Sequence, residues 1–272
     1  MQTIEQFMEG VKLPTMPEVA QSLIRTLNDD DIPFEKVRLA ISKDPALTAK
    51  LIRLANSARF GLPRTVSSLD DAITLVGLNQ VRTLGLAACM SDACPVVPGI
   101  NRNDYWKESM ACAGFSQWLA KAVGTDAQQS WLTGFMARLG ELIIGQKTPA
   151  LIEVIEQLPH HPGGRWEREK LQLGFTEGHV SAELARKWNF PPDVVQALAA
   201  SSEPLEAKPF SRLGAIVHIA TLLAEIGIEE HKTPEETIDA LPADVLTKLQ
   251  LNHDWLKDNL PDAALFADTS GL

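Results

Sequence analysis

The sequence contains few cysteines, and none of them lies in a CxxC or CxxH spacing, so the common zinc-binding patterns are not indicated. The cysteines are Cys89, Cys94 and Cys112. Because their number is odd, at least one thiol stays unpaired, and a reducing compartment fits this usage best.

Long apolar runs are also missing. The most apolar stretch, residues 213–228, is interrupted by a histidine and a glutamate. The N-terminal sequence MQTIEQFMEG lacks the basic start and the apolar stretch of a signal peptide. We therefore expect a soluble, cytoplasmic protein that does not enter the membrane.

Basic residues are fewer than acidic ones. Lys and Arg number 25 against 35 Asp and Glu, which gives a formal net charge of -10. An acidic chain repels a phosphate backbone unless a local basic cluster overrides its field, and the sequence shows no such cluster. We therefore expect no binding to nucleic acid.

Familiar catalytic motifs are absent as well. The chain has no GxSxG, GxxxxGK[ST] or GxGxxG sequence, so neither a nucleophile elbow nor a glycine-rich phosphate loop is indicated. His218 stands among apolar residues, where a hydrogen-bonded core histidine is a better explanation than a catalytic base.

What the sequence does contain is helical periodicity. Of its 272 residues, 45% are hydrophobic, enough for a large core. Nearly every periodic segment repeats at helical spacing, as in residues 19–27, and clean runs of β-branched residues are absent. Asp44 and Pro45 predict the start of a helix that runs to about Ala58. The fold is therefore predicted to be all-α.

A pair of short helices over residues 69–90, joined at Gly77, has the outline of a DNA-binding helix-turn-helix. The second helix, however, offers Arg82 as its only cation, and its remaining face is apolar. A core helix pair explains this segment better than a DNA reader does.

The segment DACPVVPGINRND, residues 92–104, is rich in Pro and Gly and has little periodicity. It predicts a boundary between two helical subdomains, residues 1–97 and residues 98–272, the second with a C-terminal extension. No repeat of 20 to 50 residues emerges, so a repeat array is not expected.

Several stretches together resemble one known family: DPALTAKLIRLANSARFG, VSSLDDAITLVGLNQVRTLGLA, GFMARLGEL and LGFTEGHVSAELARKWNFPP. They are similar, in collinear order from about Leu13 to Ile228, to the HDOD family, the HD-related output domains of bacterial signalling proteins. The resemblance implies an N-terminal helical bundle packed on a degenerate HD-like domain, with no cofactor.

The parent HD phosphohydrolases use a divalent cation that polarises a phosphate and lowers the pKa of a bound water. Its ligands are imidazoles and carboxylates that converge from several helices. Aligned on that pattern, the resemblance implies that every expected ligand is substituted here. The substituted positions, a vestigial pocket, are Glu108, Ala137, Arg138, Glu177, Ser201, Ser202 and Thr221.

Arg138 weighs most against hydrolysis, because a guanidinium cannot ligate a metal and would place a fixed positive charge beside it. The resemblance thus implies a non-catalytic signalling module that binds a protein partner or a small ligand. The alternative is a metal-dependent phosphohydrolase or phosphodiesterase with a relocated site. The donors for such a site would be Glu108, Glu141, Glu177 and His179.

Three roles remain open for Arg138 itself. It could replace the ion as a cation that crosslinks Glu108 and Glu177. It could extend along its helix to water, with its stem on apolar surface. It could also bind a small anionic ligand such as a phosphate in the vestigial pocket.

Overall fold

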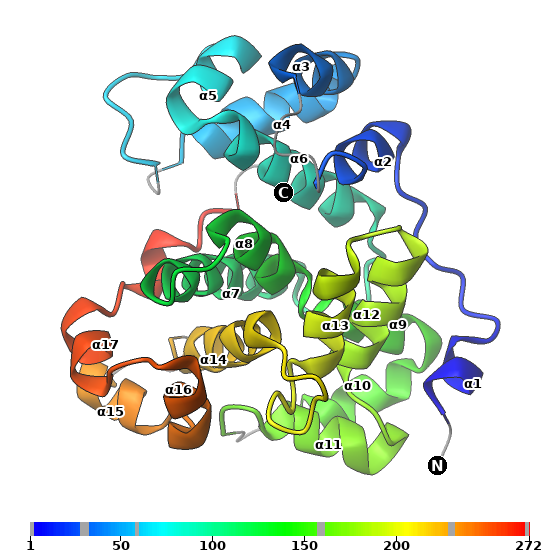
Figure 1. Ribbon diagram of the computed structural model, residues 1–272. Helices are drawn as coiled ribbons and strands as arrows, with labels where there is room; N and C mark the ends of the chain where they lie inside the picture. The colour runs from blue at the N-terminus through cyan, green and yellow to red at the C-terminus, as the bar shows by residue number, and fades with distance from the viewer. Residues whose placement is uncertain (1–2, 28–32, 58–59, 157–160, 228–231, 270–271) are drawn as a thin grey trace.

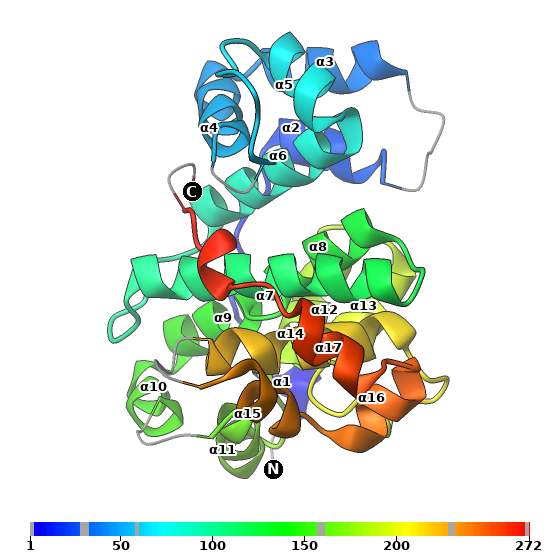
Figure 2. The ribbon, with the colours of Figure 1, turned by 90° about the vertical axis from the view of Figure 1, so that its left-hand side faces the viewer.

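The computed structural model describes residues 3–27, 33–57, 60–156, 161–227, 232–269 and 272. Within these ranges every regular element is a helix, which confirms the all-α prediction. Figures 1 and 2 show an upper group, α2 to α6, and a lower group that begins with α7. None of the helices in the described ranges is long and apolar enough to span a membrane.

The upper group is arranged around one long helix, α6 (Leu78–Ala93), with four shorter helices packed against it. They are α2 (Glu18–Ile24), α3 (Phe34–Ser42), α4 (Pro45–Ala55) and α5 (Leu69–Val76). The predicted start of α4 is confirmed, since Asp44 caps it by accepting the Leu47 N–H at 3.0 Å. The helix ends at Ala55, before the predicted end near residue 58.

The α5–α6 pair is the segment with the helix-turn-helix outline. Gly77 joins the two helices with a φ of 96°, a backbone conformation that favours glycine. All residues from Gln80 to Ser91 are buried, and Arg82 donates to the Thr26 carbonyl oxygen, just after the end of α2. Because α6 is the core of its group, it has no free face for a DNA groove; the expectation of no nucleic-acid binding remains a prediction.

The lower group has a layer of three helices, α7 (Arg102–Ala122), α8 (Ala127–Met136) and α14 (Arg212–Ile226), that pack on one another. A Cβ at Gly134 of α8 would overlap Ser116 and lie 2.9 Å from the Cys112 carbonyl oxygen, so glycine allows α8 to approach α7 closely. The remaining helices of the group's centre are α9 (Leu139–Lys147), α10 (Pro149–Ile155), α11 (Gly164–Leu173), α12 (Glu177–Lys187) and α13 (Pro192–Ala200).

The first residues of the chain do not join the upper group. Helix α1 (Ile4–Met8) lies against the lower group, where the Phe7 ring packs 5.1 Å from that of Phe175. The Trp188 indole N–H donates to the Pro14 carbonyl oxygen at 2.9 Å. Phe7, which stands within the predicted 1–97 subdomain, thus finds its apolar surface on the lower group.

The C-terminal extension covers the outer side of α7 and α14. It comprises α15 (Pro234–Asp239), α16 (Ala243–Leu249), α17 (His253–Asn259) and the short 3-10 helix η2 (Ala263–Leu265). The Trp255 ring stacks on Trp118 with centroids 5.5 Å apart, and the Phe266 ring lies 5.2 Å from Phe115. These aromatic contacts make the extension part of the same core.

Candidate functional site

Arg138 stands at a break between two helices rather than inside one. Helix α8 ends at Met136 and α9 begins at Leu139, with Arg138 as the N-cap residue. Ser181 of α12 holds this junction: its hydroxyl accepts the Gly140 N–H at 2.7 Å and donates to the Ala137 carbonyl oxygen at 2.9 Å. The break turns the Arg138 side chain into the space between the helices.

A glycine brings α12 to this junction. A Cβ at Gly140 would overlap the Glu177 carbonyl oxygen and lie 2.9 Å from the Val180 Cβ. Side chains larger than hydrogen would therefore push α9 and α12 apart. The close approach explains why Glu177, at the start of α12, lies near the residues that follow Arg138.

The Arg138 side chain is buried, with 6% of its surface exposed, and it is paired with two carboxylates. Its Nη1 forms an ion pair with Glu108 of α7. Its Nη2 and Nε donate to Glu141 Oε2 at 2.9 and 3.2 Å. The guanidinium carbon also lies 5.4 Å from the centre of the Tyr105 ring, a cation–π geometry. Arg138 thus crosslinks α7 and α9, and the solvated role is excluded.

A second buried arginine continues the network. Arg165 Nη1, from α11, lies 2.8 Å from Glu141 Oε2 and 3.4 Å from Glu177 Oε2. It also lies 3.2 Å from Glu156 Oε1, just beyond the end of α10. Glu141 Oε2 therefore bridges two guanidinium groups, and this single oxygen connects α9 with α7 and α11.

Glu177 is held from three directions but not by Arg138. Besides Arg165, the Trp166 indole N–H donates to its Oε1 at 3.1 Å. Its own backbone N–H donates to Glu169 Oε2 at 2.7 Å, so the start of α12 is capped by a side chain of α11. The predicted Arg138–Glu177 pairing is therefore corrected. Glu177 forms its ion pair with Arg165, and the second carboxylate partner of Arg138, besides Glu108, is Glu141.

The buried charges balance when one carboxyl group keeps its proton. Glu141, Glu169 and Glu177 are all buried, as are the two arginines. Burial, together with the neighbouring charge of Glu177, raises the pKa of Glu169 well above its ordinary value. With Glu169 neutral, two buried cations face two buried carboxylates, and the partly exposed Glu108 and Glu156 complete the set at its edges.

Burial also raises the pKa of Glu141 and of Glu177, although the two arginines oppose that effect. On Arg165, burial lowers the pKa, but Glu141 and Glu177 more than offset this and raise it well above the ordinary value. The arginines thus stay charged, and any proton that the cluster gains or loses resides on its carboxyl groups.

The remaining residues of the predicted vestigial pocket lie around the network, not in it. The Ser202 hydroxyl lies 3.1 Å from that of Thr176, the residue before α12. The Ser201 hydroxyl is satisfied by the Leu198 carbonyl oxygen at 2.8 Å. Thr221 of α14 donates to the Val217 carbonyl oxygen at 3.0 Å and contacts the Cys112 thiol. These side chains are buried and locally satisfied.

The histidines of this region also have structural partners. His218 Nδ1 lies 2.7 Å from the Ser201 carbonyl oxygen, and its ring stacks on Trp166 at 4.9 Å. His179 accepts the Thr176 N–H at 3.2 Å. Burial lowers the pKa of both imidazoles, so both are neutral at pH 7. His218 therefore has the contacts of a core histidine.

The residues present do not fit the metal ion of the HD phosphohydrolases. Glu108, Glu141 and Glu177 each face a guanidinium, which excludes a cation by its volume and its charge. Among the described residues, no group of three or more His, Cys, Asp or Glu side chains is arranged to hold a metal ion. No chemical step can be assigned to a metal at this place.

Two members of the network, Arg165 and Glu169, were not predicted from the sequence. They lie in GRWEREKLQL, which looks like a solvated, highly charged helix. One signal was available: Trp166, Glu169 and Leu173 follow the i, i+3, i+7 spacing of one helix face, which places Glu169 between two apolar residues. Nothing in the sequence shows that Arg165 meets Glu141 and Glu177.

Two groups of helices, with an ion-pair network buried in the lower one, define a two-part helical module. A family model of the HDOD domain matches residues 13–204, and the chain belongs to the HDOD family. An uncharacterized protein of Treponema pallidum (strain Nichols) is 25% identical over 194 residues, which are 68% of this chain and 37% of that protein. The chain therefore spans well under half of this curated relative.

Solved structures share the fold over nearly the whole chain. A Shewanella amazonensis SB2B protein named “putative phosphohydrolase” is 26% identical, with a TM-score of 0.79 and 96% of each chain covered. An HDOD domain protein of unknown function from Geobacter sulfurreducens is 20% identical, with a TM-score of 0.79 and coverage of 98% of this chain and 95% of that one. Both groups of helices thus belong to the shared architecture.

We predict that Arg138→Ala lowers the free energy of unfolding by about 3–5 kcal/mol, because it leaves buried Glu141 without one of its two guanidinium partners. Arg138→Met with Glu141→Gln should recover much of that loss, since it removes one buried charge of each sign. Urea unfolding followed by circular dichroism measures both. Arg186→Ala, at an exposed ion pair, is the control and should cost under about 1 kcal/mol. An Arg138→Ala variant as stable as the control would contradict the crosslink.

A second prediction concerns pH. Because the native pKa of Glu169 lies well above 4.5, the native state holds this proton more tightly than the unfolded chain does. The stability that it contributes is full below about pH 4.5 and is lost as the pH rises through the native pKa. Glu169→Gln cannot ionise, so it does not lose this stability. As the pH rises, the unfolding free energy of the variant minus that of the wild type should therefore increase by up to about 1.4 kcal/mol per pH unit.

The measurement is urea unfolding of both proteins at several pH values from about 4.5 to 8. Glu167→Gln, with an exposed side chain on the same helix, is the matched control. A difference between wild type and Glu169→Gln that stays constant over this range would show that Glu169 is ionised in the native state.

Proposed function

We propose that this HDOD protein is a non-catalytic signal-transduction module of the cytoplasm that acts by binding, with a protein partner as its main target. The observation that carries the proposal is the network of Arg138 and Arg165. Arg138 stands at a position where the HD pattern has a metal ligand, Arg165 lies beside it on α11, and both guanidinium groups are already neutralised by carboxylates. The buried free thiols Cys89, Cys94 and Cys112 are compatible with a reducing compartment.

A small anionic ligand at Arg138 is less well supported than a protein partner. Such a ligand needs an open guanidinium, yet Arg138 already faces Glu108 and Glu141, and Arg165 faces further carboxylates. An anion would have to displace a carboxylate and enter a cluster with several others, at a large electrostatic cost. The outer helical surface is therefore the better place for recognition.

The second candidate is a metal-dependent phosphohydrolase or phosphodiesterase with a relocated site. The name of the Shewanella amazonensis protein favours it at the level of the superfamily. The donors open to such a site oppose it, because Glu141 and Glu177 pair with arginines and His179 is engaged with Thr176. A relocated ion would have to break the network in order to bind.

We predict that protein purified without chelators contains far less than roughly one transition-metal ion per chain by elemental analysis. It should hydrolyse neither cyclic dinucleotides nor nucleoside phosphates when Mg²⁺, Mn²⁺ or Fe²⁺ is added. The reason is that Glu108, Glu141 and Glu177, the carboxylates open to such a site, each already face a guanidinium. One tightly bound iron, manganese or zinc per chain, together with turnover that Glu108→Gln or Glu177→Gln abolishes, would establish the phosphohydrolase instead.

A further inference from the structure

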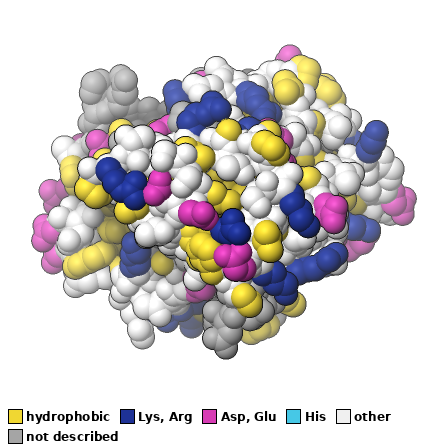
Figure 3. Space-filling view, turned by 90° about the horizontal axis from the view of Figure 1, so that it is seen from above, with side chains coloured by type: hydrophobic (Ala, Val, Ile, Leu, Met, Phe, Trp, Pro, Cys, Tyr) yellow, Lys and Arg dark blue, Asp and Glu magenta, His cyan; other side chains and the backbone are white. Residues whose placement is uncertain are grey.

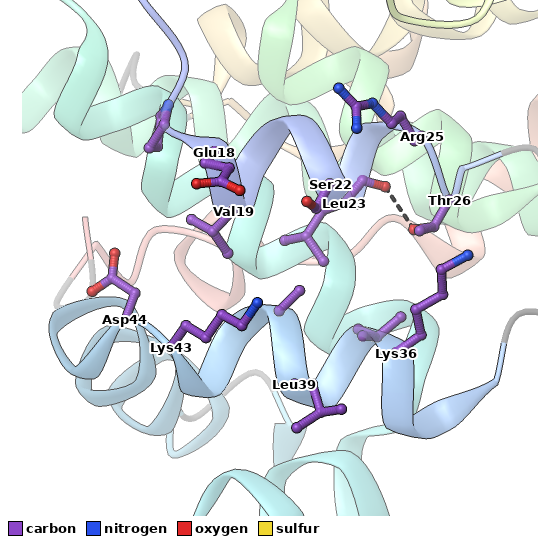
Figure 4. A pocket seen from close by; sticks show the side chains of 13 residues that line it. Glu18, Val19, Ser22, Leu23, Arg25, Thr26, Lys36, Leu39, Lys43 and Asp44 are labelled. Atoms are coloured by element: carbon purple, nitrogen blue, oxygen red, sulfur yellow. Dashed lines mark hydrogen bonds between the residues drawn. The ribbon is translucent and has the colours of Figure 1, made fainter.

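A groove between α2 and α3, in the upper group, is separate from the arginine network. It encloses about 630 Å³, and α2 and α3 form its two walls (Figure 4). Its apolar lining comes from Val19 and Leu23 on one helix and from Val37, Leu39 and Ala40 on the other. The groove is thus a concave apolar surface on the outside of the molecule.

Helix α3 exposes two large apolar side chains, one in the lining of this groove and one beside it. Leu39 is 51% exposed and Phe34 is 40% exposed, while Val37 and Ile41 of the same helix are buried against the core. An α3 that served only the fold would carry polar side chains on its outer side. Covering these two side chains would remove apolar surface from water, which favours association.

The cations at the groove distinguish it from the rest of this end of the molecule. Arg25, Lys36 and Lys43 line it, all exposed, and none of the three takes part in an ion pair or side-chain hydrogen bond within the described part of the chain. Figure 4 shows Lys36 and Lys43 toward the two ends of α3, with Leu39 between them.

The other cations of the upper group are already paired. Arg38 lies 2.9 Å from Glu35, and Arg64 lies 2.8 Å from Asp71, while Lys50 pairs with Asp92. Seen from above, Lys and Arg side chains are interspersed with acidic and hydrophobic ones and do not form one basic field (Figure 3). Unpaired positive charge is therefore a local property of the groove.

The two acidic residues of the groove have local roles. Asp44 accepts the Leu47 N–H at 3.0 Å and caps α4. Glu18 stands in the first turn of α2, where the negative charge of a carboxylate interacts favourably with the helix dipole. In a chain whose net charge is -10, the groove thus offers apolar surface bordered by cations that have no ion-pair partner among the described residues.

We propose that this groove binds an acidic amphipathic helix of a protein partner. The inference rests on the proposed function, because it assigns a surface and a chemistry to the partner of a signalling module. Helix α3 has nine residues and is about 13.5 Å long, enough for two or three turns of a partner helix. Apolar side chains at i, i+3 or i+4, and i+7 would fill the groove, and flanking Glu or Asp would meet the rim.

Cations beside apolar side chains could also bind an anionic membrane. The concave shape of the groove favours a helix over such a membrane. A membrane-binding helix presents its apolar side chains outward to a flat surface. Here the partly exposed side chains of Val19 and Ala40 line the concave groove, where ridges of a partner's side chains reach them and a flat lipid surface does not.

The test is a selection from a phage library of helical peptides of about 16 residues, with the full-length chain as bait. We expect enriched peptides to be acidic and to share the i, i+3 or i+4, i+7 apolar spacing. Affinity, measured by fluorescence anisotropy, should fall at least about tenfold for Lys36→Glu with Lys43→Glu, because two attractive contacts become repulsive. Leu39→Asp should weaken binding as well.

The matched control, Lys121→Glu with Lys187→Glu, makes the same change in charge at exposed residues that do not line the groove. Its affinity for the peptides should stay within about twofold of that of the wild type. Thermal unfolding by circular dichroism checks that both double variants fold.

Three results of the peptide experiments would overturn the inference. They are a selection that enriches no peptide above background, enriched peptides without acidic residues, and equal binding to the groove variant and the control. A fourth is sedimentation with phosphatidylglycerol vesicles that Lys36→Glu with Lys43→Glu abolishes, since this would assign the groove to a membrane. Equal binding would leave the proposed function intact, whereas metal-dependent hydrolysis would remove that function and leave the peptide data unchanged.

Discussion

One carboxylate oxygen, Glu141 Oε2, lies between the guanidinium groups of Arg138 and Arg165 at 2.9 and 2.8 Å. Through these arginines it connects α9 with Glu108 of α7 and with Glu177 of α12. A metal ion joins helices in the same manner, by drawing ligands from each toward one centre. Here the signs are reversed, and a carboxylate with two cations forms the centre.

This arrangement has a chemical consequence for the whole module. A metal centre needs an open position for water and substrate, whereas the network closes on itself and leaves its exposed edges to Glu108 and Glu156. Buried ion pairs add little net stability over apolar packing, but they impose one geometry, because breaking them leaves charges uncompensated. The lower group is thus a fixed scaffold. Under the proposed function, recognition falls to the outer surface, where α2 and α3 form the apolar groove, bordered by cations without an ion-pair partner among the described residues.

The sequence allowed much of the fold to be predicted, because helix caps and apolar spacing are local properties. The start of α4 at Pro45 is one example. Contacts between distant segments were harder. The position of α1 on the lower group depends on Phe7 meeting Phe175, and the partner of Glu177 depends on how α11 turns Arg165 inward. Arg138 could be singled out because an arginine between two glycines in an apolar helix conflicts with its surroundings; Arg165, among other charged residues, gives no such signal.

The most direct test of this account is a double-mutant cycle between Arg165→Met and Glu141→Gln, read as free energies of urea unfolding. If Glu141 is the centre of the network, each single variant loses stability and the double variant loses much less than their sum, with a coupling energy of about 2–3 kcal/mol. A coupling energy within about 0.5 kcal/mol of zero would show that the two side chains act independently, and would contradict the central role given to their ion pair.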